Sequence, residues 1–225
     1  MKHTLISAQS AIASLLRSSN YIRTTNKAGR LSRLMQIQQR FYTPEEYLVR
    51  EEVAEVRSEY RDGEIVTMAG GSIAHNQIAG NIHAFLKFAL RQTDFKPYIG
   101  DLRLWIPQYR QYTYPDVFLI YGEPVFQEQR TDTILNPCII VEVLSKSTKD
   151  YDRTDKFRYY RSIPELQEYV LINQYEVSIE QYTKTEENSW LFRAYESDAE
   201  KIVFGSINVE ITTSDIYENV KFNLI

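Results

Sequence analysis

The chain has 225 residues, 43% of them hydrophobic and 13% aromatic, and a net charge of −4. This length and apolar content favour a single domain with a buried core over two small domains. The sequence has no apolar run of about 18 residues, so we expect no membrane-spanning helix and no membrane partner. The single cysteine, Cys138, lies inside an apolar run, which favours a core position in a reducing compartment and a cytoplasmic protein.

Charge is distributed unevenly along the chain. Residues 1–34 carry six Lys or Arg side chains and no acid, which leaves residues 35–225 with a formal charge of about −10. We expect residues 1–34 to be a basic N-terminal extension, disordered or outside the fold, although their Ser, Thr and Arg content also suits an organellar transit peptide. Residues 35–225, starting at Met35, should form one domain. A body this acidic can contact nucleic acid only through a local basic patch.

The first predicted elements are a helix, a hairpin and a longer helix. Thr43 is a helix cap followed by Pro and two acids, so a helix should run to about Glu52. Residues 58–68 are typical of two strands joined by a turn at Asp62-Gly63. Residues 75–91 carry apolar side chains at helical spacing and should form the long helix.

The rest of the chain is dominated by apolar runs typical of strands. We predict strands over residues 98–106, 114–121, 137–144 and 168–173, with a shorter helix over residues 150–162 before the last of them. Antiparallel segments over residues 178–183, 189–195 and 202–211 complete the chain. This order predicts an α/β (α+β) fold: a mixed β-sheet flanked by helices, with additional C-terminal antiparallel strands.

Two acids lie at the edges of the predicted buried strands. Asp116 precedes one apolar run and Glu142 comes late in another. Burying an unpaired carboxylate costs several kcal/mol, so such acids usually have a cationic partner or a metal ion. Alternation places Asp116 on the face of Phe118, and Glu142 on the face of Ile140. If these faces coincide, the two carboxylates could bind Mg²⁺ together with water and a phosphate oxygen; ordinary salt bridges are the alternative.

The segment that follows is rich in cations. Asp152, Lys156 and Tyr160 share one face of the predicted helix. Lys156 could stabilise a phosphorane or orient water near the acids, or it could form a routine surface pair with Asp152. The segment also predicts a patch for nucleic-acid phosphates, with a solvated helix face as the alternative. The candidate contacts in this patch are Lys146, Lys149, Arg153, Arg158 and Tyr160.

A set of short motifs spans residues 41 to about 173. In chain order they are Tyr42–Tyr47, Glu59–Ile65, Met68 with His75, Pro115-Asp116, Pro137, Glu142–Thr148, Asp150–Lys156 with Tyr159-Tyr160, and Glu168-Tyr169. With these motifs in this order, the chain resembles the Uma2 family of restriction endonuclease-like proteins, which have the PD-(D/E)xK nuclease fold. The resemblance implies a metal-dependent endodeoxyribonuclease with DNA as its partner and Mg²⁺ as its cofactor, which Mn²⁺ can replace.

The resemblance also implies roles for particular residues. Asp116 and Glu142 would bind the metal ion. Leu144 stands where the general nuclease pattern has its lysine, and the family pattern moves that lysine to the following helix, where it corresponds to Lys156. Lys146, just beyond the strand, is the alternative candidate for the nuclease lysine.

A third acid is expected from the predicted hairpin. Glu59 and Glu64 both match the family pattern and flank the turn, and strand alternation does not choose between them. His75 matches the family's histidine and could contact substrate or position a water molecule. We therefore count Glu59, Glu64 and His75 with Asp116, Glu142 and Lys156 as candidate catalytic residues.

Two other classes of function remain compatible with the sequence. One is a nuclease fold kept as a nucleic-acid or protein-binding module with weak or no catalysis. The other is a metal-independent glycosidase that uses paired carboxylates. For the nuclease, fold analogy predicts a homodimer, because many enzymes that cut duplexes pair to reach both strands.

Overall fold

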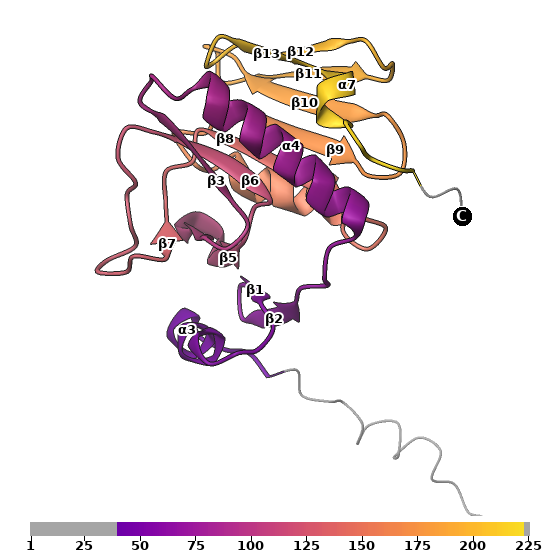
Figure 1. Ribbon diagram of the computed structural model, residues 1–225. Helices are drawn as coiled ribbons and strands as arrows, with labels where there is room; N and C mark the ends of the chain where they lie inside the picture. The colour runs from indigo at the N-terminus through magenta and orange to yellow at the C-terminus, as the bar shows by residue number, and fades with distance from the viewer. Residues whose placement is uncertain (1–39, 223–225) are drawn as a thin grey trace, which may run out of the picture. The chain divides into compact units, whose positions relative to one another are not determined.

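The computed structural model describes residues 40–222. The predicted extension over residues 1–34 and the predicted domain start at Met35 therefore lie outside the described residues. Figure 1 shows the described chain as sheets covered by helices. Among the described residues, no helix is long and apolar enough to cross a membrane.

The first helix and hairpin form as the sequence predicts. Helix α3 (Pro44–Glu52) begins with a capping box, in which Thr43 and Glu46 each accept a hydrogen bond from the other's backbone N–H. Strands β1 (Ser58–Arg61) and β2 (Glu64–Thr67) pair antiparallel. Asp62 and Gly63 join them with positive φ angles of 43° and 108°, as a tight hairpin turn of the mirror-image type requires.

The hairpin belongs to a five-stranded sheet of order β2-β1-β5-β4-β7. All neighbours in this sheet are antiparallel except β4 and β7. The short 3₁₀ turn η1 (Pro107–Tyr109) connects β4 to β5. The other strands are β4 (Arg103–Ile106), β5 (Gln111–Thr113) and β7 (Thr133–Ile134).

A six-stranded mixed sheet forms the centre of the fold. Its order is β11-β10-β9-β8-β6-β3, and β8 and β9 are its parallel pair. The strands are β3 (Phe95–Ile99), β6 (Val117–Tyr121), β8 (Ile139–Leu144), β9 (Glu168–Asn173), β10 (Ile179–Lys184) and β11 (Trp190–Tyr195). A separate hairpin of β12 (Lys201–Phe204) and β13 (Val209–Thr212) follows, and α7 (Thr213–Ile216) comes after it.

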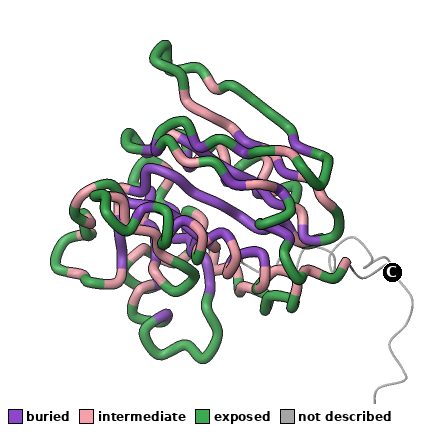
Figure 2. The backbone as a smooth tube through the Cα atoms, turned by 45° about the horizontal axis from the view of Figure 1, so that its top comes forward, coloured by how far each residue is buried: buried purple, intermediate pink, exposed green. Residues whose placement is uncertain are grey.

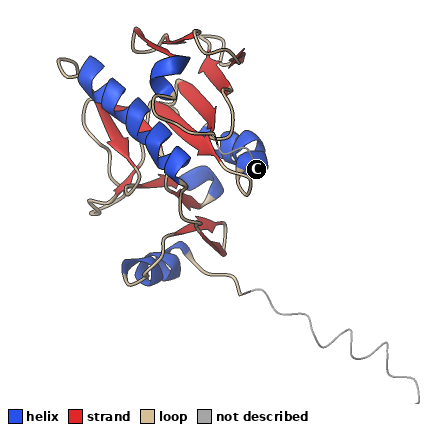
Figure 3. Cartoon of the chain, turned by 45° about the vertical axis from the view of Figure 1, so that its right-hand side comes forward, coloured by secondary structure: helices blue, strands red, loops and turns tan. Residues whose placement is uncertain are grey.

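Helices cover both faces of the central sheet (Figures 1 and 3). Helix α4 (Ile73–Ala89) packs Ile78, Ile82 and Leu86 onto one face, in a cluster that also holds the apolar side of the β12–β13 hairpin. The opposite face packs against a helical segment made of α5 (Lys149–Tyr151), the π-helical turn η2 (Asp152–Lys156) and α6 (Phe157–Tyr160). Figure 2 shows that buried stretches of the chain run through the middle of the fold and exposed stretches lie around them. The mixed, helix-flanked α+β architecture is as predicted.

Four predicted segments differ from the structure in detail. The strand predicted over residues 98–106 is two strands in different sheets, because the chain turns at Gly100, where φ is +72°. The run over residues 114–121 forms a strand only from Val117, and residues 202–211 form a hairpin instead of one segment. The helix predicted over residues 150–162 contains the π-helical turn. The short elements β7 and α7 were not predicted.

Candidate active site

Asp116 and Glu142 lie on facing positions of two paired strands. Strands β6 and β8 are antiparallel, with Phe118 opposite Ile140, and the same register carried two residues further sets Asp116 against Glu142. The two predicted faces therefore coincide. The backbone N–H of Val143 donates to Asp116 Oδ2 at 2.8 Å, which fixes this carboxylate beside the strand. Two hard oxygen donors thus meet at this edge of the central sheet.

The helical segment places an ammonium group against these acids. Lys156 Nζ lies 2.8 Å from Glu142 Oε1 and 3.5 Å from both Glu59 Oε1 and Asp152 Oδ1. Its side chain is 8% exposed and that of Asp152 is 3% exposed, so the surface-pair alternative for these two residues is wrong. Leu144, in the position of the usual lysine, packs in the apolar cluster beneath the helix. Lys146 lies over the Tyr175 ring, 5.5 Å from its centroid.

Glu142 is buried in a crowded electrostatic environment. Its Oε1 accepts a hydrogen bond from Tyr160 Oη at 2.6 Å in addition to its contact with Lys156. Burial raises the pKa of Glu142; Lys156 opposes the rise, and the negative charges of Asp116 and Asp152 add to it. Burial alone would lower the pKa of Lys156, but the surrounding Glu142, Tyr160, Glu59 and Asp152 raise it. The positive charge therefore stays on the lysine.

Glu59, from the hairpin, is held by Thr113, Arg61 and Lys156. Thr113 Oγ1 donates to its Oε1, and Arg61 donates to its Oε2 through Nε at 3.1 Å and Nη2 at 2.7 Å. Burial raises the pKa of this carboxyl, but the positive charges of Lys156 and Arg61 outweigh burial and lower it overall. Of the two acids that flank the turn, Glu59 lines the site and Glu64 does not.

His75 reaches the acids from the start of helix α4. Ser72 caps this helix, accepting a hydrogen bond from the His75 backbone at 3.0 Å. The His75 ring Nε2 lies 2.9 Å from Asp116 Oδ1. Burial lowers the pKa of His75, but the hydrogen bond to Asp116 and its negative charge outweigh burial, and the net shift is upward. His75 and the Val143 backbone therefore hold both oxygens of Asp116.

These residues line one cleft of about 650 Å³. Glu59, Asp116, Glu142 and Asp152 supply its carboxylates, and Arg61, Lys156 and His75 supply its basic groups. Asp152 and Arg61 were not among the predicted site residues. Asp152 is 2% exposed, and its Oδ1 makes no hydrogen bond within the described part of the chain. The signal that could have found it is its shared helix face with Lys156 and Tyr160.

Comparisons with known proteins show the family of this chain. The Uma2 family, described as "Putative restriction endonuclease", matches residues 44–212. The chain belongs to the Uma2 family. Two Synechocystis sp. (strain ATCC 27184 / PCC 6803 / Kazusa) relatives carry the descriptions uncharacterized protein sll1609 and uncharacterized protein slr1290. The first is 38% identical over 74% of this chain and 94% of its own length, and the second is 35% identical over 80% and 93%.

A solved structure shares the fold. The chain is similar, with a TM-score of 0.65, to the crystal structure of a "putative nuclease belonging to DUF820" from Anabaena variabilis ATCC 29413. The similarity covers 78% of this chain and 97% of that one at 16% sequence identity. It confirms the predicted nuclease-like fold class.

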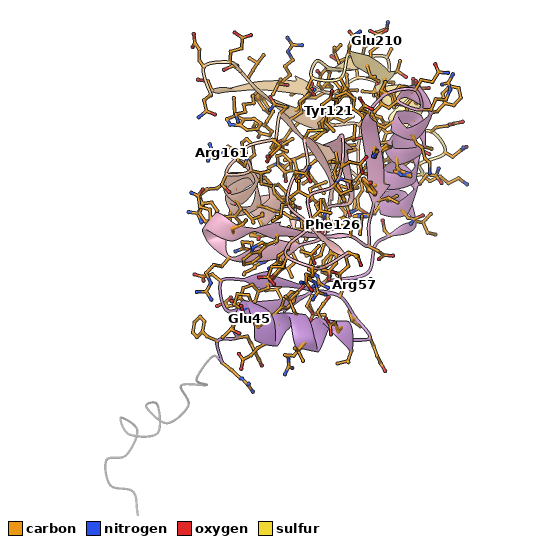
Figure 4. All side chains as sticks on the ribbon, turned by 90° about the vertical axis from the view of Figure 1, so that its left-hand side faces the viewer. Glu45, Arg57, Tyr121, Phe126, Arg161 and Glu210 are labelled. Carbon is orange, nitrogen blue, oxygen red and sulfur yellow. The ribbon has the colours of Figure 1, made fainter. Side chains whose placement is uncertain are left out.

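The predicted phosphate patch of this Uma2 protein lies outside the cleft, and one of its five residues is buried. Tyr160 is fully buried and bonded to Glu142, so its prediction as a nucleic-acid contact is wrong. Arg153 is paired with Glu180 at 2.7 Å, and Arg158 with Asp155 at 3.0 Å. Of the predicted contacts Lys146, Lys149, Arg153, Arg158 and Tyr160, none lines the cleft. Arg161, which directly follows α6, points outward in Figure 4.

The carboxylates of the Uma2 site suit a hard metal ion with few protein ligands. The described residues contain no group of three or more His, Cys, Asp or Glu side chains arranged around a metal ion. Mg²⁺ does not require one, because it commonly takes one or two carboxylates and fills its octahedron with water and phosphate oxygens. Glu142 receives its hydrogen bonds on Oε1, and within the described chain none falls on Oε2. Asp116 and Glu142 therefore fit Mg²⁺ as a two-carboxylate site.

Proposed function

We propose that this Uma2 protein is a Mg²⁺-dependent endonuclease that hydrolyses phosphodiester bonds of DNA, with Mn²⁺ able to replace Mg²⁺. The observation that carries the proposal is the contact between Lys156 Nζ and Glu142 Oε1, 2.8 Å long, beside Asp116 in the cleft. A cation and two hard oxygen donors at one point are what phosphodiester hydrolysis needs. The family description and the fold of the nuclease-like neighbour support the same reaction class.

The protein's own groups have distinct tasks in this mechanism. Asp116 and Glu142 would hold the metal ion, which supplies Lewis-acid stabilisation of a phosphoryl oxygen and a more acidic attacking water. His75 and the Val143 N–H fix the orientation of Asp116. Tyr160 Oη does the same for Glu142. Because these hydrogen bonds fix both carboxylates before substrate binds, the carboxylates do not have to reorient during catalysis.

Lys156 acts on the reacting phosphate. Its ammonium group has three hydrogen-bond donors, and in the resting protein they face Glu59, Glu142 and Asp152. When substrate enters, one donor can turn to the attacking water or to a phosphoryl oxygen while the acids keep the group charged and in place. In-line attack by the water oxygen on phosphorus then forms a new P–O bond and breaks the P–O bond to the leaving oxygen. The water gives up a proton in this step and the leaving oxygen takes one up, both by way of solvent.

A plasmid-nicking assay tests the proposal. Wild-type protein with Mg²⁺ or Mn²⁺ should nick supercoiled plasmid, whereas D116A, E142A and K156A should lose at least about a hundredfold in rate. K87A is the control, because Lys87 is an exposed lysine in the last turn of helix α4 and does not line the cleft. EDTA should abolish the activity. Equal nicking by all variants would refute the site, and activity that survives EDTA would favour a metal-independent hydrolase.

The alternative function is a nuclease-fold binding module with weak or no catalysis, and the metal dependence of DNA binding separates it from the endonuclease. The cleft lining holds four carboxylates against Arg61 and Lys156, so without a metal ion it repels a phosphate backbone. The endonuclease therefore predicts that DNA binding requires a divalent cation such as non-catalytic Ca²⁺. DNA binding that is equally tight in EDTA, without cleavage in Mg²⁺, would instead support the binding module.

The predicted homodimer remains a proposal, supported only by analogy with enzymes that cut both strands of a duplex. Light scattering after size exclusion measures the mass directly. A monomer at micromolar concentration with and without duplex DNA would contradict the proposal.

A further inference from the structure

Arg61 is held in the cleft in an unusual way. Its guanidinium group donates through Nε and Nη2 to a single oxygen of Glu59. The centre of the guanidinium lies 3.7 Å from the centroid of the Tyr151 ring, a distance typical of a stacked cation–π contact. Its side chain is 28% exposed, and both Arg61 and Tyr151 line the cleft. Among the hydrogen bonds of the described residues, Nη1 makes none.

The other cations near the cleft either pair with carboxylates of the protein or lie outside the cleft lining. Lys156 is 8% exposed and surrounded by three carboxylates. His75 is paired with Asp116. The cations of the predicted phosphate patch lie outside the cleft lining. Arg61 therefore lines the cleft as a partly exposed cation, and within the described residues its Nη1 donates no hydrogen bond.

Resting on the endonuclease function proposed above, we propose that Arg61 binds a backbone phosphate of the substrate strand next to the phosphate that is cut, with Tyr151 and Glu59 holding its guanidinium flat for this contact. Arginine suits this task because its planar fork matches phosphate geometry and stacks on aromatic rings, whereas lysine does neither. Holding the fork in place before substrate arrives reduces the entropy lost on binding.

This assignment changes the interpretation of Glu59. One oxygen of this carboxylate faces Lys156 and the other accepts from Arg61, so the acid links the two cations of the cleft. The resemblance suggested a third catalytic acid here. The contacts instead make Glu59 a positioning residue. It holds Lys156 near the phosphate that is cut and Arg61 near the adjacent phosphate.

Binding measurements separate this inference from catalysis. A fluorescein-labelled duplex oligonucleotide would be titrated with R61M, R61K and wild-type protein in Ca²⁺, and cleaved in Mg²⁺. R61M should bind about tenfold to a hundredfold more weakly, and the loss should fall mainly on KM. The slope of log K against log salt should become less steep by about one unit, as for one lost phosphate contact. R61K should recover only part of the affinity.

Matched variants test the geometry. R110M removes an exposed arginine near the same hairpin that does not line the cleft, and it should bind like wild type. Y151A should weaken binding in the same direction as R61M, and Y151F, which keeps the ring beneath Arg61, should weaken it less than Y151A does. E59Q should keep Mg²⁺ binding by calorimetry, which E142Q should abolish. Thermal unfolding of each variant checks that it is folded.

The outcomes are distinct. If wild type binds and cleaves DNA but R61M and R61K match it, or if R110M loses as much as R61M, the role of Arg61 is overturned and the endonuclease function stands. Loss of Mg²⁺ binding in E59Q would overturn the positioning role of Glu59. If wild-type protein neither binds nor cleaves DNA with a divalent cation, the proposed function fails, and this inference fails with it.

Discussion

Lys156 Nζ and Glu142 Oε1 lie 2.8 Å apart, joining the helical segment to the edge of the central sheet. The pair sits among Glu59 and Asp152, and all four side chains are at most 8% exposed. A buried cluster of three acids and one cation has a negative formal charge. It is therefore a poor source of stability but a good site for a second cation. A bound divalent ion would neutralise the negative charge that Lys156 leaves uncompensated.

Removing the lysine should show this imbalance directly. K156M leaves three buried carboxylates without their cation, so it should lower the free energy of unfolding by about 3 kcal/mol, measured by urea titration in EDTA. Mg²⁺ should recover a larger share of stability in K156M than in wild type, because the ion then compensates the same acids. Equal effects of Mg²⁺ on the two proteins would contradict this account of the cluster.

Tyr160 should tune the metal site without contacting the metal ion. Y160F removes the 2.6 Å hydrogen bond to Glu142 and frees the carboxylate to rotate. Loss of such a supporting partner typically weakens metal binding by about tenfold to a hundredfold, which calorimetry with Mn²⁺ would measure. Y182F is the control, because Tyr182 donates to Glu180 away from the cleft. A Y160F protein with wild-type metal affinity would show that Glu142 is oriented by Lys156 alone.

The parts of the fold and site that the sequence predicts are those governed by local rules. The Thr43 cap and the Asp62-Gly63 turn depend on a few neighbouring residues. The facing positions of Asp116 and Glu142 follow from strand alternation, once the two strands pair. The position of Lys156 near the acids could be predicted because a helix that follows a strand packs back on the sheet.

The rest depended on long-range packing. Periodicity gives the face that Asp152, Lys156 and Tyr160 share but does not say that this face meets the sheet. Tyr160 was therefore predicted as a nucleic-acid contact, and a surface pair of Asp152 with Lys156 stayed open as an alternative. Glu59 and Glu64 are equivalent by local rules, and only the pairing of β1 with β5 brings Glu59 beside Thr113. The sequence does not show that Arg61 lies on the Tyr151 ring, because the two residues are far apart in the chain.

Cys138 should be an unreactive thiol in the folded protein. It is buried between strands, and burial raises its pKa to about 11. At pH 8 the thiolate fraction is then on the order of one in a thousand, and the thiolate is the reactive form. Iodoacetamide should modify the native protein very slowly and the urea-unfolded protein completely, as mass spectrometry would show. Rapid labelling at pH 8 without urea would mean that the strand end opens readily.

Asp132 should contribute stability that depends on pH. Hydrogen bonds from Arg130 are the main reason that its pKa falls from 3.8 to about 2. A carboxyl with a lowered pKa in the folded state stabilises the protein fully above its unfolded pKa, and this contribution is lost as pH falls from about 4 to about 2. D132N should therefore be less stable than wild type at pH 7, with the difference shrinking as pH falls below 4. Urea unfolding at pH 7, 5, 4 and 3 would measure it.

D155N is the comparison, because Asp155 pairs with Arg158 on the exposed side of the helix and no comparable difference between its curve and that of wild type is expected. A D132N deficit that stays constant over this range would show that Arg130 holds Asp132 by geometry and not by charge.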